Sequence, residues 1–196
     1  MFVAFVNYAA GSGARVRGMM QHVNIKIFAK TDAGVNVADA IPVFHRWIQN
    51  RALPEMLIDV ADYSHVPEGP GVLLIAHEAN YSLDQARDQL GLLYNRKAKD
   101  GSGISLRQAY DAAVKACERL ETEPEFGGKL AFDRNHLELV LNDRLVYPNT
   151  DEAWGEVKTE LTRFFDGVFG AGKYVMERQG EPRERLRAMV RKVVAS

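Results

Sequence analysis

The chain has 196 residues, of which 46% are hydrophobic and 26% are charged, and its formal net charge at pH 7 is −1. These are the proportions of an ordinary globular protein, so a chain disordered throughout is excluded, and the near-zero charge provides no general attraction for nucleic acid. Because Cys117 is the single cysteine, neither an intramolecular disulfide nor a cysteine-based zinc cluster can form.

The N-terminal segment Met1–Val6 is apolar, but it has neither the basic flank of a signal peptide nor the length of a membrane span. We therefore predict a soluble protein in the cytoplasm, where a lone cysteine stays reduced. Met19 and Met20 precede the first strongly patterned segment. We accordingly expect residues 1–19 to be an N-terminal extension and residues 20–196 to form a single α+β domain.

Strand and helix patterns alternate through the first half of this domain. Polar and apolar residues alternate from residue 22, which is typical of a half-buried strand, and Ser82 followed by Gln85 is the sequence of a helix capping box. The patterns predict strands over residues 22–30, 56–63, 71–79 and 91–97. They also predict a helix from Asp39 to Ile48, after the first strand, and a helix over 82–90, before the last strand. This βαββαβ order is the order of a ferredoxin-like unit.

The second half contains the clearer helix patterns. Ser105 with Gln108 predicts another capping box, and Asn149 is the predicted cap of a helix that ends at Gly170. The remaining segments predict a hairpin over 130–141 with its turn at 133–136, a strand at 174–176, and a last helix that begins at Pro182. We expect a two-layer α/β sandwich, with a mainly antiparallel sheet and helices largely on one face.

The segment from Asp59 to Asp84 carries ionisable side chains on otherwise apolar strands, where they must be paired or solvated. If residues whose numbers sum to about 137 pair, Asp59 lies opposite Glu78, whereas a one-residue slip places Asp59 and His77 on the same face. Either register gathers carboxylates and an imidazole, which acid–base catalysis or a hard metal ion requires. We predict Asp59, His77 and Glu78 as catalytic groups, and Asp62, Tyr63, His65 and Tyr81 as ligand-binding residues.

The leading hypothesis is a small-molecule- or metal-binding protein, which is an enzyme if these side chains act as acid and base. The metal, the cofactor and the substrate stay undefined. Polar residues on the solvent face of an edge hairpin explain the same pattern without any site. The alternative hypothesis is a non-catalytic interaction module that acts as a homodimer. A homo-oligomer is expected under both hypotheses, and neither a membrane nor a nucleic acid is expected as a partner.

Two further patterns concern anionic ligands. The segment 167–173 has the glycine and lysine spacing of a phosphate-binding loop, but Tyr174 replaces the required Ser or Thr and the segment ends a predicted helix. The run Pro182–Lys192 contains five cations against the single acid Glu184. Such a basic face can bind nucleic acid, an acidic partner or a membrane surface, but it is more often simply solvated.

Overall fold

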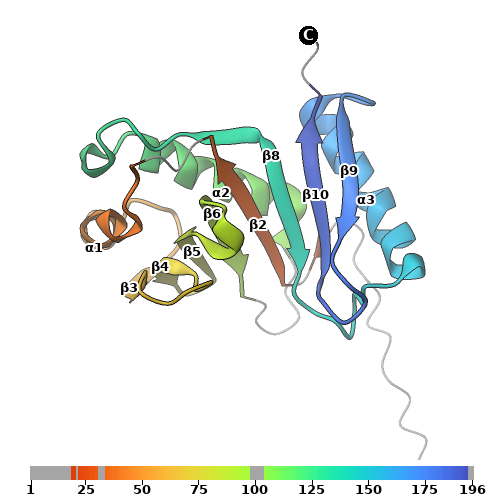
Figure 1. Cartoon of the computed structure of the whole chain (residues 1–196), viewed down its shortest axis with the longest axis horizontal. Helices are drawn as coiled ribbons and strands as arrows, with labels where there is room; N and C mark the ends of the chain where they lie inside the picture. Colours follow the sequence, from red (N-terminus) through yellow and green to blue (C-terminus); the bar gives the residue numbers. More distant parts are fainter. Residues whose placement is uncertain (1–18, 21, 31–33, 98–103, 194–196) are drawn as a thin grey trace, which may run out of the picture.

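A computed structural model describes residues 19–20, 22–30, 34–97 and 104–193 of the chain. Within these ranges the protein is α+β, with an eight-stranded antiparallel sheet and three α-helices (Figure 1). Residues 1–18 of the predicted extension lie outside the described residues. No helix in the described ranges combines the length and the apolar composition that a membrane crossing requires.

The elements follow one another in a simple order along the chain. The strands are β1 Met19–Met20, β2 Val23–Ala29, β3 Leu57–Tyr63, β4 Gly71–Ala76, β5 Ala79–Asp84, β6 Gly91–Arg96, β7 Ile104–Ser105, β8 Phe132–Leu141, β9 Tyr174–Gln179 and β10 Leu186–Lys192. The α-helices are α1 Ala40–Gln49, α2 Leu106–Glu121 and α3 Asp151–Phe169, and the 3-10 helices are η1 Val37–Asp39, η2 Ala86–Asp88 and η3 Pro124–Phe126.

The large sheet has the strand order β3-β4-β5-β6-β2-β8-β10-β9, and β1 pairs separately with β7. Strand β2 lies in its interior and is buried on both faces. Because side chains alternate along a strand, Ile25 and Ile27 face the hydrophobic core, whereas Asn24 and Lys26 face the opposite side of the sheet. Most of the buried polar side chains among the described residues lie on this opposite side of the sheet.

The helices contribute to one hydrophobic cluster. Trp47 of α1, Leu120 of α2 and Phe165 of α3 belong to the same cluster as Ile25 of β2 and Val190 of β10. In Figure 1, α2 and α3 lie behind the sheet, α2 near β6 and β2 and α3 beside β9. The alternating strand residues of the other sheet face take no part in this cluster.

Several predicted elements are confirmed. The strands expected over 22–30, 56–63 and 91–97 correspond to β2, β3 and β6. The capping box of Ser105 and Gln108 begins α2, with both of its hydrogen bonds present. Gly170 ends α3, although Thr150 rather than Asn149 provides the side-chain cap at the other end.

The predicted helix over 82–90 is wrong. This segment forms the end of β5 and the short helix η2, and Ser82 is buried within the sheet. Tyr81 and Leu83 alternate into the core, and the pairing of β5 with β4 and β6 outweighs the local capping signal. The first half therefore has the order β-α-β-β-β-β, and the ferredoxin-like order is not confirmed.

Two further predictions in the second half are wrong. The expected hairpin over 130–141 is a single strand, β8: Phe132 and Leu137 both pair with β2, and His136 pairs with β10. Arg134 of this segment forms an ion pair with Glu121 of α2. The expected last helix is strand β10. Leu186, Ala188 and Val190 are buried at every second position, which is the periodicity of a strand.

Candidate functional site

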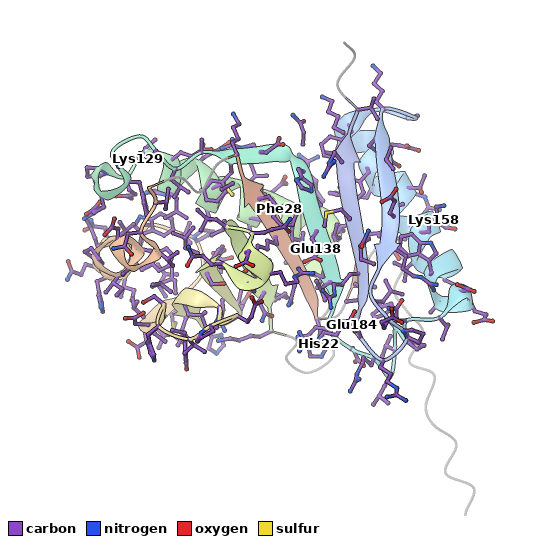
Figure 2. The ribbon with its side chains drawn as sticks, in the orientation of Figure 1. His22, Phe28, Lys129, Glu138, Lys158 and Glu184 are labelled. Carbon is purple, nitrogen blue, oxygen red and sulfur yellow. The ribbon has the colours of Figure 1, made fainter. Side chains whose placement is uncertain are left out.

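A pocket of about 570 Å³ lies on the sheet face opposite the hydrophobic core, and we call it the sheet-face pocket. Its floor is formed by residues of strands β2, β5, β6 and β8, namely Asn24, Lys26, Asp84, Leu93, Glu138 and Val140. Helix η2 forms one wall, and the connection between β9 and β10 forms the other. In Figure 2, Glu138 lies over the middle of the sheet, and Glu184 lies at the lower end of the β9–β10 connection.

The strand register brings the floor residues together. Lys26 is directly opposite Leu93 on one neighbouring strand and directly opposite Glu138 on the other. Asn24, two residues before Lys26 on β2, faces the same side of the sheet and lies opposite Val140 of β8. Facing residues on adjacent strands lie about 5 Å apart at Cβ. Residues distant in sequence therefore form one continuous polar surface.

Lys26 and Asp84 form a buried ion pair in this floor, with only 3% and 4% of the two residues exposed. The Lys26 Nζ also donates a hydrogen bond to the carbonyl oxygen of Ala86 at 3.3 Å. Gly91 makes room for this side chain, because a Cβ at that position would lie 2.9 Å from the Lys26 Cε. The pair thus links the interior strand β2 to the start of η2.

Glu138 is the second buried acid of the floor, with 2% of its surface exposed. Its Oε2 accepts a hydrogen bond from Arg87, and this contact raises the pKa of the Arg87 guanidinium, which stays charged. The Glu138 Oε1 and the Asn24 Oδ1 are buried and have no hydrogen-bond partner among the described residues. Because such oxygens are costly to bury unpaired, the floor favours a partner that brings hydrogen-bond donors.

The wall at η2 has an unusual backbone conformation. Arg87 and Asp88 have φ angles of 63° and 53°, in the left-handed region that L-residues rarely adopt. The Arg87 N–H donates to Glu68 Oε2 at 2.6 Å, and this contact fixes the turn. Backbone strain of this kind persists only where surrounding contacts over-determine it, and it is concentrated at functional sites.

Arginines form the opposite wall. Arg187 forms an ion pair with Glu184 at 3.0 Å, and Arg144 donates to the Arg183 carbonyl oxygen at 2.9 Å. The guanidinium groups of Arg183 and Arg185 have no ion-pair partner within the described part of the chain. Six cationic side chains and three carboxylates line the pocket, so its net charge is +3 in a chain of net charge −1.

The structure does not bring the three predicted catalytic residues together. Asp59 lies opposite Ile75 rather than Glu78, so both predicted registers are wrong: β4 ends at Ala76, before His77 and Glu78. Asp59 is exposed on the edge strand. His77 and Glu78 form the turn between β4 and β5 and line a different pocket, of about 860 Å³. We call this second cavity the helix-side pocket.

The predicted ligand-binding residues are also dispersed. Asp62 accepts hydrogen bonds from the hydroxyl and the backbone N–H of Ser64, and these bonds lower the pKa of its carboxyl. Tyr63 and His65 are exposed, whereas Tyr81 is buried. Among the described residues, no three His, Cys, Asp or Glu side chains gather in a way that could hold a metal ion. Asp84, which ends the predicted segment, is the one residue of that segment placed in the sheet-face pocket floor.

No protein-family model matches this chain, and no curated protein matches it. The geometry of the two pockets is therefore the basis for assigning a function.

Proposed function

We propose that the protein binds a small anionic molecule in the sheet-face pocket. The observation that carries this proposal is the wall of four arginines that faces a buried floor with unpaired acceptor oxygens. Guanidinium groups bind phosphate and carboxylate with paired hydrogen bonds, and a cavity of about 570 Å³ has the size of a metabolite site.

The floor restricts the class of ligand further. The unpaired oxygens of Glu138 and Asn24 are acceptors, so they favour hydroxyl or amino groups on the ligand. Arg183 and Arg185 favour an anionic group at the opposite wall. A phosphomonoester or carboxylate that also carries hydroxyl groups satisfies both requirements. If the protein is an enzyme that uses this pocket, Glu138 is the buried carboxylate best placed to act on such a ligand.

The test is a calorimetric titration of ribose 5-phosphate, with ribose and inorganic phosphate as comparison ligands. In the double variant Arg183→Ala/Arg185→Ala, affinity for the phosphorylated sugar should fall about tenfold or more, because charge-assisted hydrogen bonds are lost. The matched control is Lys158→Ala/Arg163→Ala, which removes two exposed cations from α3 without touching the pocket. No binding of any of the three ligands, or equal losses in both double variants, would refute the proposal.

The acid–base hypothesis for Asp59, His77 and Glu78 stays a prediction. Its support is now limited to His77 and Glu78, which line one pocket. Native mass spectrometry of freshly purified protein should detect a bound molecule or metal that is absent from the variant His77→Ala/Glu78→Ala. Identical spectra for two equally stable proteins would contradict it.

A homodimer is a second candidate function, favoured by the edge strand β3. Met56, just before this strand, is 71% exposed, and Ile58 within it is 52% exposed. The outer backbone groups of an edge strand can pair with a second copy of the chain. Sedimentation should show a dimer at micromolar concentration, and Ile58→Lys should shift it towards the monomer. A strict monomer for the unmodified chain would exclude this candidate.

Two finer predictions also remain proposals. The two-layer α/β sandwich is supported by the single hydrophobic cluster that the helices share with alternating strand residues. The cytoplasmic location is supported by the composition, with its single cysteine, and cell fractionation tests it.

A further inference from the structure

The helix-side pocket has an environment unlike that of the sheet-face pocket. It lies between α2, the β4–β5 turn, the end of β6 and residues 54–56. Apolar groups contribute much of its lining, among them Ile104 and Ala112. Three carboxylates and two cations line it, so with neutral histidine its net charge is −1, against +3 for the sheet-face pocket.

Glu55 is a half-buried carboxylate of this pocket without a cationic partner. Its Oε1 accepts a hydrogen bond from the hydroxyl of Tyr81 at 2.5 Å, and its Oε2 is buried with no hydrogen-bond partner in the described part of the chain. No Lys, Arg or His of the described ranges lies within ion-pair distance of it. Arg96, the one arginine among the described lining residues, is paired with Glu78 at 2.8 Å.

The tyrosines beside Glu55 provide hydroxyl groups but no charge. The rings of Tyr81 and Tyr94 meet edge to face, with their centroids 5.2 Å apart. Burial raises the pKa of Tyr94 to about 12 and raises the pKa of Tyr81 further, so both hydroxyls stay protonated at neutral pH. Neither hydroxyl can therefore form an ion pair with Glu55, and buried carboxylates are normally paired.

We propose that the helix-side pocket binds an organic ammonium ion, that is, a primary amine with an apolar body. The ammonium group pairs with Glu55, and the body packs against Ile104 and Ala112. The cavity of about 860 Å³ is large enough for such a ligand. This site is independent of the anion site proposed above, because the two pockets share no lining residue and have opposite net charge.

The test uses 2-phenylethylamine as the probe and 2-phenylethanol as its neutral counterpart of similar shape. Calorimetry should give millimolar or tighter affinity for the amine, and about tenfold weaker binding of the alcohol, because only the amine forms the charged contact. In NMR spectra, the signals of Ile104 and Ala112 should move during the amine titration. The signals of residues that line the sheet-face pocket should not.

The decisive variant is Glu55→Gln, which keeps an acceptor for the Tyr81 hydroxyl but removes the charge. It should bind the amine about tenfold more weakly, whereas the matched control Glu152→Gln, at an exposed position on α3, should bind it as the unmodified chain does. A second variant, Ala112→Leu, narrows the cavity without touching Glu55 and should also weaken binding. Failure of the unmodified chain to bind the amine, equal affinity for the alcohol, or full affinity in a folded Glu55→Gln variant would each overturn the proposal.

Discussion

The ion pair between Lys26 and Asp84 allows a quantitative prediction about stability. Replacing Lys26 with methionine keeps most of the apolar stem but leaves the Asp84 carboxylate buried without its cation. Removing one partner of a buried pair typically costs about 3–5 kcal/mol of unfolding free energy. Total stability of a domain is about 5–15 kcal/mol, so this single variant should be severely destabilised.

The double variant Lys26→Met/Asp84→Leu removes both charges and should recover most of the loss, because an apolar pair needs no compensation in a buried position. Arg107→Met provides the matched control: it breaks the exposed pair of Arg107 with Asp111, whose side chains are 65% and 52% exposed. That change should cost less than about 1 kcal/mol.

Urea unfolding followed by circular dichroism measures all three free energies. A loss in Lys26→Met no larger than the loss in Arg107→Met would refute the reasoning. A double variant as unstable as the single variant would also refute it, because the cost would then come from lost packing and not from the unpaired carboxylate.

The remaining predictions concern titrating groups. Burial alone would raise the pKa of Glu121, but its hydrogen bonds from Arg134 and from the backbone N–H of Phe132 lower it below the ordinary value of 4.5. The stability that this contact contributes is therefore complete above pH 4.5 and is lost as the pH falls through the lowered pKa. The stability of the Glu121→Gln variant should lack this loss when its unfolding is followed towards acid pH. Burial raises the pKa of the Cys117 thiol well above its usual range, so Ellman's reagent should label it only after unfolding, and rapid labelling of the native protein would contradict this.

The elements predicted correctly are those with local signals. The capping box of Ser105 and Gln108 satisfies backbone groups within one turn of helix, so it acts wherever the helix packs. Ser82 and Gln85 have the same spacing, but there the long-range pairing of β5 with β4 and β6 determines the structure. A capping pattern therefore predicts a helix only where no neighbouring strand competes for the segment.

The sheet-face pocket could not be predicted because its residues meet through strand order. The basic run around Arg185 was recognisable in the sequence, and the alternation of Leu186, Ala188 and Val190 was the signal that could have identified it as a strand. Even then, only the pairing of β10 with β8, and of β8 with β2, brings Arg187 to the same face as Lys26. Sequence alone contains no local trace of that order.

Strand β6 connects the two proposed sites through its alternation. Leu93 lines the sheet-face pocket, and the next residue, Tyr94, lines the helix-side pocket. Both positions depend on one register between β6 and β2, and Gly91 lies at the end of that pairing, opposite Phe28.

Gly91→Ala should therefore weaken the binding of both ligands. The added Cβ would lie 2.8 Å from the backbone oxygen of Ile27 and 2.9 Å from the Lys26 Cε, so β6 or β2 must shift, at a cost of about 1–3 kcal/mol. Titrating the folded variant with ribose 5-phosphate and with 2-phenylethylamine measures the effect. Arg183→Ala/Arg185→Ala should weaken the binding of ribose 5-phosphate only, and Glu55→Gln should weaken the binding of 2-phenylethylamine only. A Gly91→Ala variant that binds both ligands normally would show that neither pocket depends on this register.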